Sequence, residues 1–287
     1  MNSFLFITHV TPKAKRSELR SSLYEIHLRA LSAQTYDKWK VLCIGEEEKK
    51  DSKFFQVSLK QTLDKNEISN QLSEIYSRKD VLEYINESNY IVKLDDDDII
   101  SPKILERLAY FIGDVYYDEF HAFYDITSSQ VSLQKRDWIA STCIQKTEHA
   151  ITKLRIEGLN NIYLNSIFYS DHSQIWHKYY ANKQKFISDK FHPIYLRVLS
   201  PTSITAGVGN SILNSVNDID FENYFEYLNK FGSWNEKIPE EFMNYNKPLR
   251  DSWLSFSGTE HISIPLKKQD IFSRISKSLV KYVRREN

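Results

Sequence analysis

The sequence is poor in cysteine and has no excess of charge of either sign. Its two cysteines, Cys43 and Cys143, are far apart and do not have the spacing of metal-binding pairs. A disulfide-rich secreted scaffold is therefore excluded, and we expect a reduced, cytoplasmic chain. The 38 basic residues balance the 38 acidic ones. Because nucleic-acid binding usually requires a clear basic excess, we expect no nucleic-acid partner.

Long apolar segments are also absent. No stretch approaches the roughly 20 apolar residues of a transmembrane helix. The apolar run at residues 4–10 lacks the basic start and the cleavage site of a signal peptide, so it predicts a first strand. The stretch "ITAGVGNS", residues 204–211, lacks the G-x-G-x-x-G order and is expected to be a loop. No Ser-His-Asp, Cys-His or P-loop pattern is present.

Apolar runs and helical patterns alternate over the first hundred residues. Residues 4–10, 39–45 and 90–94 predict buried strands, and residues 18–34 and 67–88 carry apolar side chains at helical spacing. This alternation is typical of a doubly wound, mostly parallel sheet with flanking helices. In such sheets, ligands bind at the carboxyl ends of the strands, near the point where the strand order reverses.

The second half is less regular. Residues 119–133 and 193–200 predict strands, and residues 172–184 predict a helix. Residues 265–287 have an apolar stripe with lysines and arginines around the rest of a helix. A basic amphipathic helix of this kind suits either docking on the domain or contact with a membrane surface.

Four consecutive aspartates, residues 95–98, follow the strand predicted at residues 90–94. Adjacent carboxylates at a strand end suit a hard divalent cation, which would offset their repulsion. A bare acidic run is more often a solvated turn. Here an apolar strand precedes the run, and Ser101 with Pro102 predicts a helix start after it, so the context favours a site. An EF-hand is excluded because its glycine and spaced acidic ladder are missing.

Three stretches of the chain resemble the GT-A glycosyltransferases, and in particular the inverting family 2. "VKLDDDDIISPKILERL" resembles that family's strand, D-x-D-D motif and following helix. "LRALSAQTYDKWKVLCIG" and "SDHSQIWHKYYANKQKF" resemble two further family segments, and together the three cover about residues 1–200. The aspartates combined with "DH" at residues 171–172 also resemble a bacterial group of rhamnosyltransferases.

The resemblance implies roles for the acidic residues. Asp95 and Asp97 correspond to the D-x-D pair that binds Mn²⁺ or Mg²⁺, with Asp97 the direct metal ligand and Asp95 nearer the donor. Asp96 lies between them on the cofactor-binding side, and Asp98 extends the motif. Asp171 corresponds to the general base, beside which Trp176 matches a family aromatic residue.

Further donor contacts are expected. Thr8 and His9 end the first strand, so the topology places them at the cleft, where His9 suits either a nucleotide contact or a structural role. The resemblance adds Arg78, which lies near a family arginine upstream of D-x-D. Glu46, within "GEEE", stands in for the family's carboxylate that contacts the nucleobase. "THVTP" in place of "PTYN", and Ser170 in place of a glutamate, are departures that alter donor recognition more than the fold.

The expected organisation is a GT-A-like catalytic domain at residues 1–215 and a helical C-terminal extension at residues 216–287. The domain would comprise a nucleotide-binding half, residues 1–110, and an acceptor half, residues 111–215. We expect a metal-dependent, inverting glycosyltransferase of the hexosyltransferase type that joins a sugar from a nucleotide-diphosphate donor to a glycan or lipid-linked glycan. Bacterial surface polysaccharide synthesis, at the inner face of the membrane, is the expected setting.

Two other classes of protein stay open at this point. A nucleotidyltransferase would also use strand-end carboxylates with Mg²⁺, and "PKAKRSELR", residues 12–20, is a basic segment near the first strand. A non-catalytic carbohydrate-binding protein could keep the same fold with an altered nucleotide loop. Metal-dependent turnover of a nucleotide sugar distinguishes the three.

Overall fold

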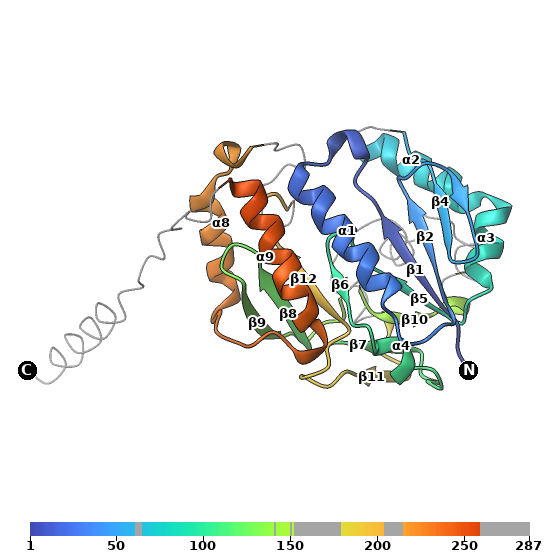
Figure 1. Ribbon diagram of the computed structural model, residues 1–287. Coiled ribbons are helices and arrows are strands. Elements are labelled where there is room, and N and C mark those ends of the chain that lie inside the picture. Colours follow the sequence, from blue (N-terminus) through green and yellow to red (C-terminus); the bar gives the residue numbers. More distant parts are fainter. Residues whose placement is uncertain (61–64, 141, 150, 152–178, 204–214, 259–287) are drawn as a thin grey trace, which may run out of the picture.

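A computed structural model describes residues 1–60, 65–140, 142–149, 151, 179–203 and 215–258 (Figure 1). Its centre is an eight-stranded sheet in the order β11–β7–β10–β5–β1–β2–β4–β3. Four neighbouring strands are parallel: β5 (Tyr90–Lys93), β1 (Phe4–His9), β2 (Trp39–Ile44) and β4 (Phe54–Val57). The strands outside this parallel block are β3 (Lys49–Lys50), β7 (Val115–Tyr117), β10 (Ile144–Lys146) and β11 (Lys185–Ile187).

A second sheet has four strands in the order β6–β12–β8–β9. They are β6 (Ile99–Ile100), β12 (Tyr195–Leu199), β8 (Phe120–Asp125) and β9 (Gln130–Lys135). β12 is parallel to β8, whereas the β6–β12 and β8–β9 pairs are antiparallel. Because β6 begins just after the acidic run, residues 95–98 connect the two sheets.

Helices cover both faces of the central sheet (Figure 1). α1 (Glu18–Ser32) covers one face, and α9 (Met243–Ser257) packs beside it in front of β8 and β12 of the second sheet (Figure 1). α2 (Lys65–Ser77) and α3 (Lys79–Asn86) cover the other face of the central sheet. Successive side chains of β1 point to opposite faces of the sheet, which explains why helices cover both faces. Phe4 and Phe6 join the core under α1, whereas Leu5 and Ile7 join the core under α2 and α3. The parallel strands are therefore apolar on both faces.

The remaining helices lie beside the second sheet and at the ends of strands. α8 (Phe221–Leu228) packs on that sheet, where Tyr224 and Leu228 contact the apolar residues of β8 and β12. α4 (Ile104–Arg107) follows β6. Short 3₁₀ segments complete the described elements: Lys13–Lys15, Val216–Asp218, Asn229–Phe231 and Glu240–Phe242.

The predicted fold class is confirmed: the structure is α/β, with a mostly parallel centre flanked by helices. The strands predicted at 4–10, 39–45, 90–94 and 193–200 are present, and residues 67–88 form a helix pair that breaks at Arg78. Residues 204–211 and 265–287, and residues 172–178 of the helix predicted at 172–184, lie outside the described residues. The division into domains stays a prediction.

The helix predicted to start at Ser101 and Pro102 is present, but it starts later than predicted. α4 begins at Ile104 with Lys103 as its N-cap, and it lasts only four residues. Ser101 is buried, its backbone N–H donates to the Ile194 carbonyl, and its hydroxyl bonds Glu241. The Ser101 hydroxyl also accepts from the Lys103 N–H at 3.3 Å, so it bonds the turn before α4 and connects this loop to the C-terminal part of the chain.

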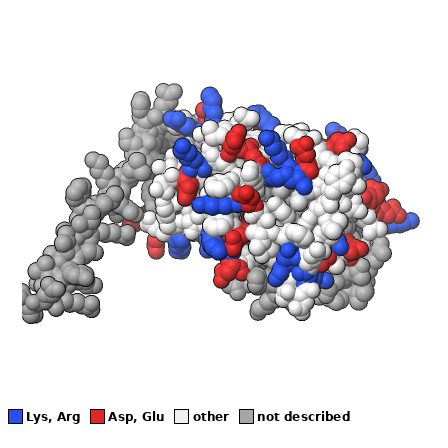
Figure 2. Space-filling view, turned by 90° about the horizontal axis from the view of Figure 1, so that it is seen from below, with Lys and Arg blue, Asp and Glu red and all other residues white. Residues whose placement is uncertain are grey.

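Both cysteines are free and buried. Within the ranges that the structure describes, no helix is both long and apolar enough to cross a membrane. Figure 2 shows acidic and basic side chains interspersed over the described part of one face of the molecule. This mixture matches the balanced composition.

Candidate active site

The carboxyl ends of β1 and β5 meet where the strand order reverses. After β1 the chain adds β2 and β4 on one side of β1, and it then returns to place β5 on the other side. β1 and β5 are parallel, with Ile7 opposite Lys93, so both strands end at the same edge of the sheet. Such a switch point is where open α/β sheets bind ligands.

Residues 95–98, called here the acidic loop, lie at this edge. The Leu94 N–H donates to the Ile7 carbonyl at 3.0 Å, which carries the β1–β5 pairing up to the loop. A turn follows, in which the Asp98 N–H donates to the Asp95 carbonyl at 3.1 Å. Asp96, Asp97 and Asp98 are 4%, 7% and 3% exposed, whereas Asp95 is half-buried. The acidic loop is therefore not a solvated turn.

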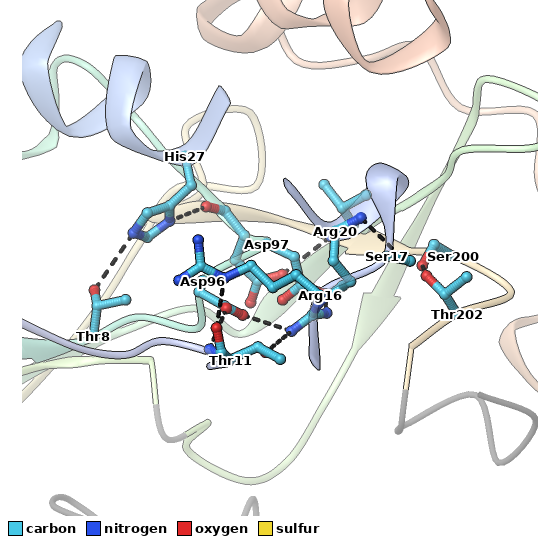
Figure 3. A network of polar contacts seen from close by, with 12 residues as sticks. Thr8, Thr11, Arg16, Ser17, Arg20, His27, Asp96, Asp97, Ser200 and Thr202 are labelled. Carbon is cyan, nitrogen blue, oxygen red and sulfur yellow. Dashed lines mark hydrogen bonds and ion pairs between the residues drawn. The ribbon is translucent and has the colours of Figure 1, made fainter. Parts of the chain in front are cut away.

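Arg20 neutralises the middle of the acidic loop (Figure 3). One guanidinium nitrogen, Nη2, lies 2.6 Å from Asp96 Oδ1, and the other, Nη1, bonds Asp97 Oδ2. The Arg20 side chain is only 10% exposed. Burial acts to lower the pKa of Arg20, but the aspartates outweigh it and raise that pKa further above its usual value. Arg20 is therefore charged.

Asp96 also binds the chain that follows β1. Its Oδ2 accepts from the Thr11 N–H at 2.8 Å, and the Arg20 Nη2 donates to the Thr11 hydroxyl at 3.2 Å. Arg16 bonds the Thr11 carbonyl and Glu46, and its guanidinium lies 4.4 Å from the centre of the Tyr24 ring. Glu46 is thus joined to the acidic loop through Arg16 and Thr11.

Behind the loop, His27 of α1 fixes the backbone at Asp98. The His27 Nδ1 lies 2.9 Å from the Asp98 carbonyl, which can only accept, so Nδ1 carries the proton. The Nε2 lies 3.4 Å from the Thr8 hydroxyl, which is then the donor. Burial lowers the pKa of His27, which keeps the ring neutral. Figure 3 shows the ring between Thr8 and the loop.

Asp98 and Arg197 connect the acidic loop to β12. The Val198 N–H donates to Asp98 Oδ1 at 3.1 Å. Burial raises the pKa of Asp98 well above its usual value, and it raises the pKa of Asp97 to about 6. Burial also opposes the charge on Arg197, but Tyr195, Asp98 and Asp95 raise the Arg197 pKa. A second arginine is therefore close enough to the acidic loop for the loop's charge to stabilise its charged form.

The structure brings some of the predicted site residues together and separates others. Thr8 is fully buried, and the His9 Nε2 lies 2.8 Å from the Tyr76 hydroxyl. The partners of Arg78 are Asp80 and Glu48, with shortest distances of 2.7 and 2.8 Å, and neither belongs to the acidic loop. Asp171 and Trp176 lie outside the described residues.

The sequence interpretation missed Arg16, Arg20, His27 and Arg197. A signal was present for the three arginines. Arg16 and Arg20 fall in the basic segment at residues 12–20, and Arg197 interrupts the apolar strand "PIYLRVLS". A buried acidic run needs nearby cations, and these arginines were candidates for that role. Nothing in the spacing of His27, on the buried face of α1, distinguished it from a core residue.

The residues of the acidic loop fit a divalent cation only in part. Carboxylate oxygens are the ligands that Mg²⁺ and Mn²⁺ prefer. However, both Asp96 oxygens and one Asp97 oxygen are already bonded within the protein. Among the residues that can be described, no group of three or more His, Cys, Asp or Glu side chains is arranged to hold a metal ion. A cation at Asp97 would have to compete with Arg20.

Comparisons with known proteins give structural neighbours only. No family model and no curated protein matches the chain. Residues 1–349 of TarS from S. aureus are 14% identical, with a TM-score of 0.41, over 93% of this chain and 77% of that one. The glycosyltransferase GlyE of Streptococcus pneumoniae TIGR4 is 11% identical, with a TM-score of 0.36, over 88% of this chain and 63% of that one.

Another structural neighbour is the galactosyltransferase LgtC, whose structure contains donor and acceptor sugar analogs. It is 11% identical, with a TM-score of 0.37, over 84% of this chain and 99% of that one. The likeness to all three concerns the arrangement of helices and strands.

Proposed function

We propose that this chain is a GT-A-like glycosyltransferase that takes a sugar from a nucleotide-diphosphate donor. One observation carries the proposal: the acidic loop lies at the carboxyl ends of β1 and β5, where the strand order reverses. Buried aspartates are costly to keep beside one another. Placing them at the ligand-binding edge of the sheet is expected if a cationic or metal-bound ligand uses them.

In this proposal the loop binds the donor's diphosphate through Asp95 and Asp97 and a Mn²⁺ or Mg²⁺ ion. When bound, the ion stabilises the negative charge of the departing diphosphate. Thr8, His9 and Glu46 belong to the strand ends beside the loop, and we assign the nucleoside to that side. Asp96 holds the Thr11 backbone and Arg20, so its contribution is to shape the donor site.

The acceptor is proposed to be a hydroxyl of a glycan or lipid-linked glycan, as in bacterial surface polysaccharide synthesis. Asp171 removes the proton of that hydroxyl as it attacks the anomeric carbon, which inverts the configuration. This role rests on the sequence resemblance of residues 170–186. Contact with a membrane surface through residues 265–287 stays a prediction.

The test measures turnover of a panel of nucleotide sugars in the presence of Mn²⁺. Release of the nucleoside diphosphate is the signal that is monitored. We expect wild type to release the diphosphate from one donor, and Asp171→Asn and Asp97→Ala to lose at least about 100-fold in rate. Asp251→Asn is the matched control, since Asp251 is exposed on α9 and pairs with Lys247 of the same helix. Absence of turnover and of nucleotide binding by wild type would overturn the proposal.

The nucleotidyltransferase alternative is weakened by the placement of residues 12–20. Two arginines of that basic segment, Arg16 and Arg20, are ion-paired with the protein's own carboxylates. They do not form a phosphate-binding loop of the glycine-rich kind. Release of pyrophosphate instead of a nucleoside diphosphate would favour this alternative, and sugar binding without any turnover would favour a non-catalytic protein.

A further inference from the structure

Arg20 bridges two adjacent aspartates that also stand in the proposed donor site. Its two terminal nitrogens bond different carboxylates, Nη2 on Asp96 and Nη1 on Asp97. All three side chains are at least nine-tenths buried. A charged pair of this kind is poorly screened by solvent, so each partner strongly determines where the other lies.

The position of Arg20 is not favoured by its own helix. Ser17 caps α1, and its hydroxyl accepts from the Arg20 N–H at 3.2 Å, so Arg20 lies in the first turn. A cation is unfavourable there because the helix amino end is itself partly positive. The Arg20 Nε is also buried, and it has no hydrogen-bond partner among the described residues. The aspartates, and not the helix, therefore hold the guanidinium in place.

Two cations would therefore compete for the Asp97 carboxylate. The resemblance makes it the direct metal ligand, whereas the structure shows it paired with Arg20. A divalent ion on the same carboxylate would lie within a few ångströms of the guanidinium, and like charges at that distance repel strongly in a buried site. Arg20 and the metal therefore exclude each other at Asp97 unless an added anion lies between them.

We propose that Arg20 is a resident counter-cation that occupies Asp97 until the donor arrives. This inference rests on the proposed function. The donor's diphosphate supplies negative charge with which Arg20 pairs. Asp97 is then available to bind the metal. The site consequently binds its metal together with the nucleotide and hardly at all without it. Arg20 is a positioning residue in this scheme, and it sets the metal affinity of the acidic loop.

Binding of Mn²⁺ alone tests the inference without any turnover. Free Mn²⁺ is counted by its electron paramagnetic resonance signal in titrations of wild type, Arg20→Met and Arg20→Gln. Arg29→Met is the matched control, because Arg29 is on the same helix but 68% exposed. Arg20→Gln keeps a hydrogen-bond donor for one aspartate, so it decides the test if Arg20→Met does not fold.

We expect both Arg20 variants to bind Mn²⁺ about tenfold or more tightly than wild type, because a buried positive charge has been removed from the metal's ligand. Arg29→Met should match wild type. Folded Arg20 variants that bind Mn²⁺ no more tightly than wild type would overturn the inference.

A second series adds nucleoside diphosphates to wild type and counts bound Mn²⁺ again. We expect one diphosphate to raise the Mn²⁺ affinity of wild type by about tenfold or more, because its charge relieves the repulsion. A wild type that binds Mn²⁺ equally with and without a bound diphosphate would contradict the exchange. If no diphosphate binds at all while the Arg20 variants gain Mn²⁺, the proposed function fails and the competition at Asp97 stands.

Discussion

Neighbouring aspartates of the acidic loop have different partners. Asp96 binds a backbone N–H and Arg20, Asp97 binds Arg20, and Asp98 accepts from the Val198 N–H of β12. Asp95 is the most exposed of the four. Asp96 and Asp98 therefore build the loop, and Asp95 and Asp97 are the residues that we propose bind a ligand.

Asp98 gives a prediction at the scale of one residue. Its pKa is raised by burial, so its acid form is favoured, and an asparagine would keep the acceptor for the Val198 N–H. We expect Asp98→Asn to change the free energy of unfolding by less than about 1 kcal/mol, and Asp98→Ala to lower it by about 1–3 kcal/mol. Urea denaturation of both variants measures this. Equal losses in the two variants would mean that the negative charge itself is required.

At this scale the sequence predicted where charge gathers but not what neutralises it. The acidic loop was found because it follows a buried strand. The Arg20 pairing depends on α1 crossing the ends of β1 and β5, and no local pattern encodes that approach. His27 shows the same limit, because its two partners, Thr8 and the Asp98 carbonyl, lie on different strand ends.

Gly45 ends β2 in a conformation that other residues rarely adopt. Its φ is +118°, and a Cβ there would lie 2.4 Å from the Val10 carbonyl oxygen. Val10 precedes Thr11, which binds Asp96, so the two strand ends and the acidic loop are in contact through this point. A side chain at residue 45 would therefore displace the backbone of Val10 and Thr11, which contacts the acidic loop.

We expect Gly45→Ala to lower the free energy of unfolding by about 3 kcal/mol or more, because strained backbone and a clash with backbone act together. The control is Gly258→Ala. Gly258 has a φ of +73° but no atom within 4 Å of its added Cβ, so its cost should be about 1 kcal/mol. Thermal unfolding compares the two. A similar cost for both would show that the Val10 contact relaxes.

Asp118, in the turn between β7 and β8, predicts a dependence of stability on pH. It is fully buried and accepts from the Ile194 N–H at 2.9 and 3.0 Å and from the Ser188 hydroxyl. Burial outweighs these hydrogen bonds and raises the pKa of Asp118 to about 7. The unfolded state therefore binds fewer protons between pH 4 and 7, so this group's stabilisation is complete at low pH and is lost as pH rises.

As pH rises from about 4 to 7, the free energy of unfolding of wild type should fall relative to that of Asp118→Asn, by up to about 1.4 kcal/mol per pH unit. Above pH 7 the difference should be constant. Urea denaturation from pH 4 to 8 measures it. A wild type that becomes more stable relative to Asp118→Asn as pH rises would contradict the raised pKa.

Helices and strands with a strong apolar periodicity could be predicted from the sequence, whereas the shortest elements could not. β1, β2, β5, α1 and the α2–α3 pair carry clear apolar patterns and were found close to their observed bounds. β3 and α4 have two and four residues, too few for any period to be read. Their positions are set by partners elsewhere: β4 for β3, and the Ser101 contacts with Ile194 and Glu241 for the start of α4.

On the scale of the whole molecule, the C-terminal described part belongs to the main core. Phe242, Leu249 and Trp253 are 0–3% exposed and share one apolar cluster with β1, β2 and α1. Arg107 and Ser101 also bond Glu241. An element predicted as an extension is thus packed against α1, the helix that carries Arg20.

Trp253→Ala should therefore lower the free energy of unfolding by about 3–5 kcal/mol, as expected for a buried aromatic residue. Met243→Ala on the same helix is the control, since Met243 is 54% exposed and should cost less than about 1 kcal/mol. Unfolding in urea, followed by circular dichroism and by tryptophan fluorescence, should give one coincident transition. Two separate transitions would mean that the C-terminal part unfolds on its own.

Binding of a nucleotide donor at the acidic loop can be measured by titration calorimetry of nucleoside diphosphates. Wild type and Asp97→Ala would be titrated with each diphosphate, with and without Mn²⁺. The account predicts that wild type binds one nucleotide in a Mn²⁺-dependent manner and that Asp97→Ala loses this binding. Wild type that binds no nucleotide under either condition would contradict the account.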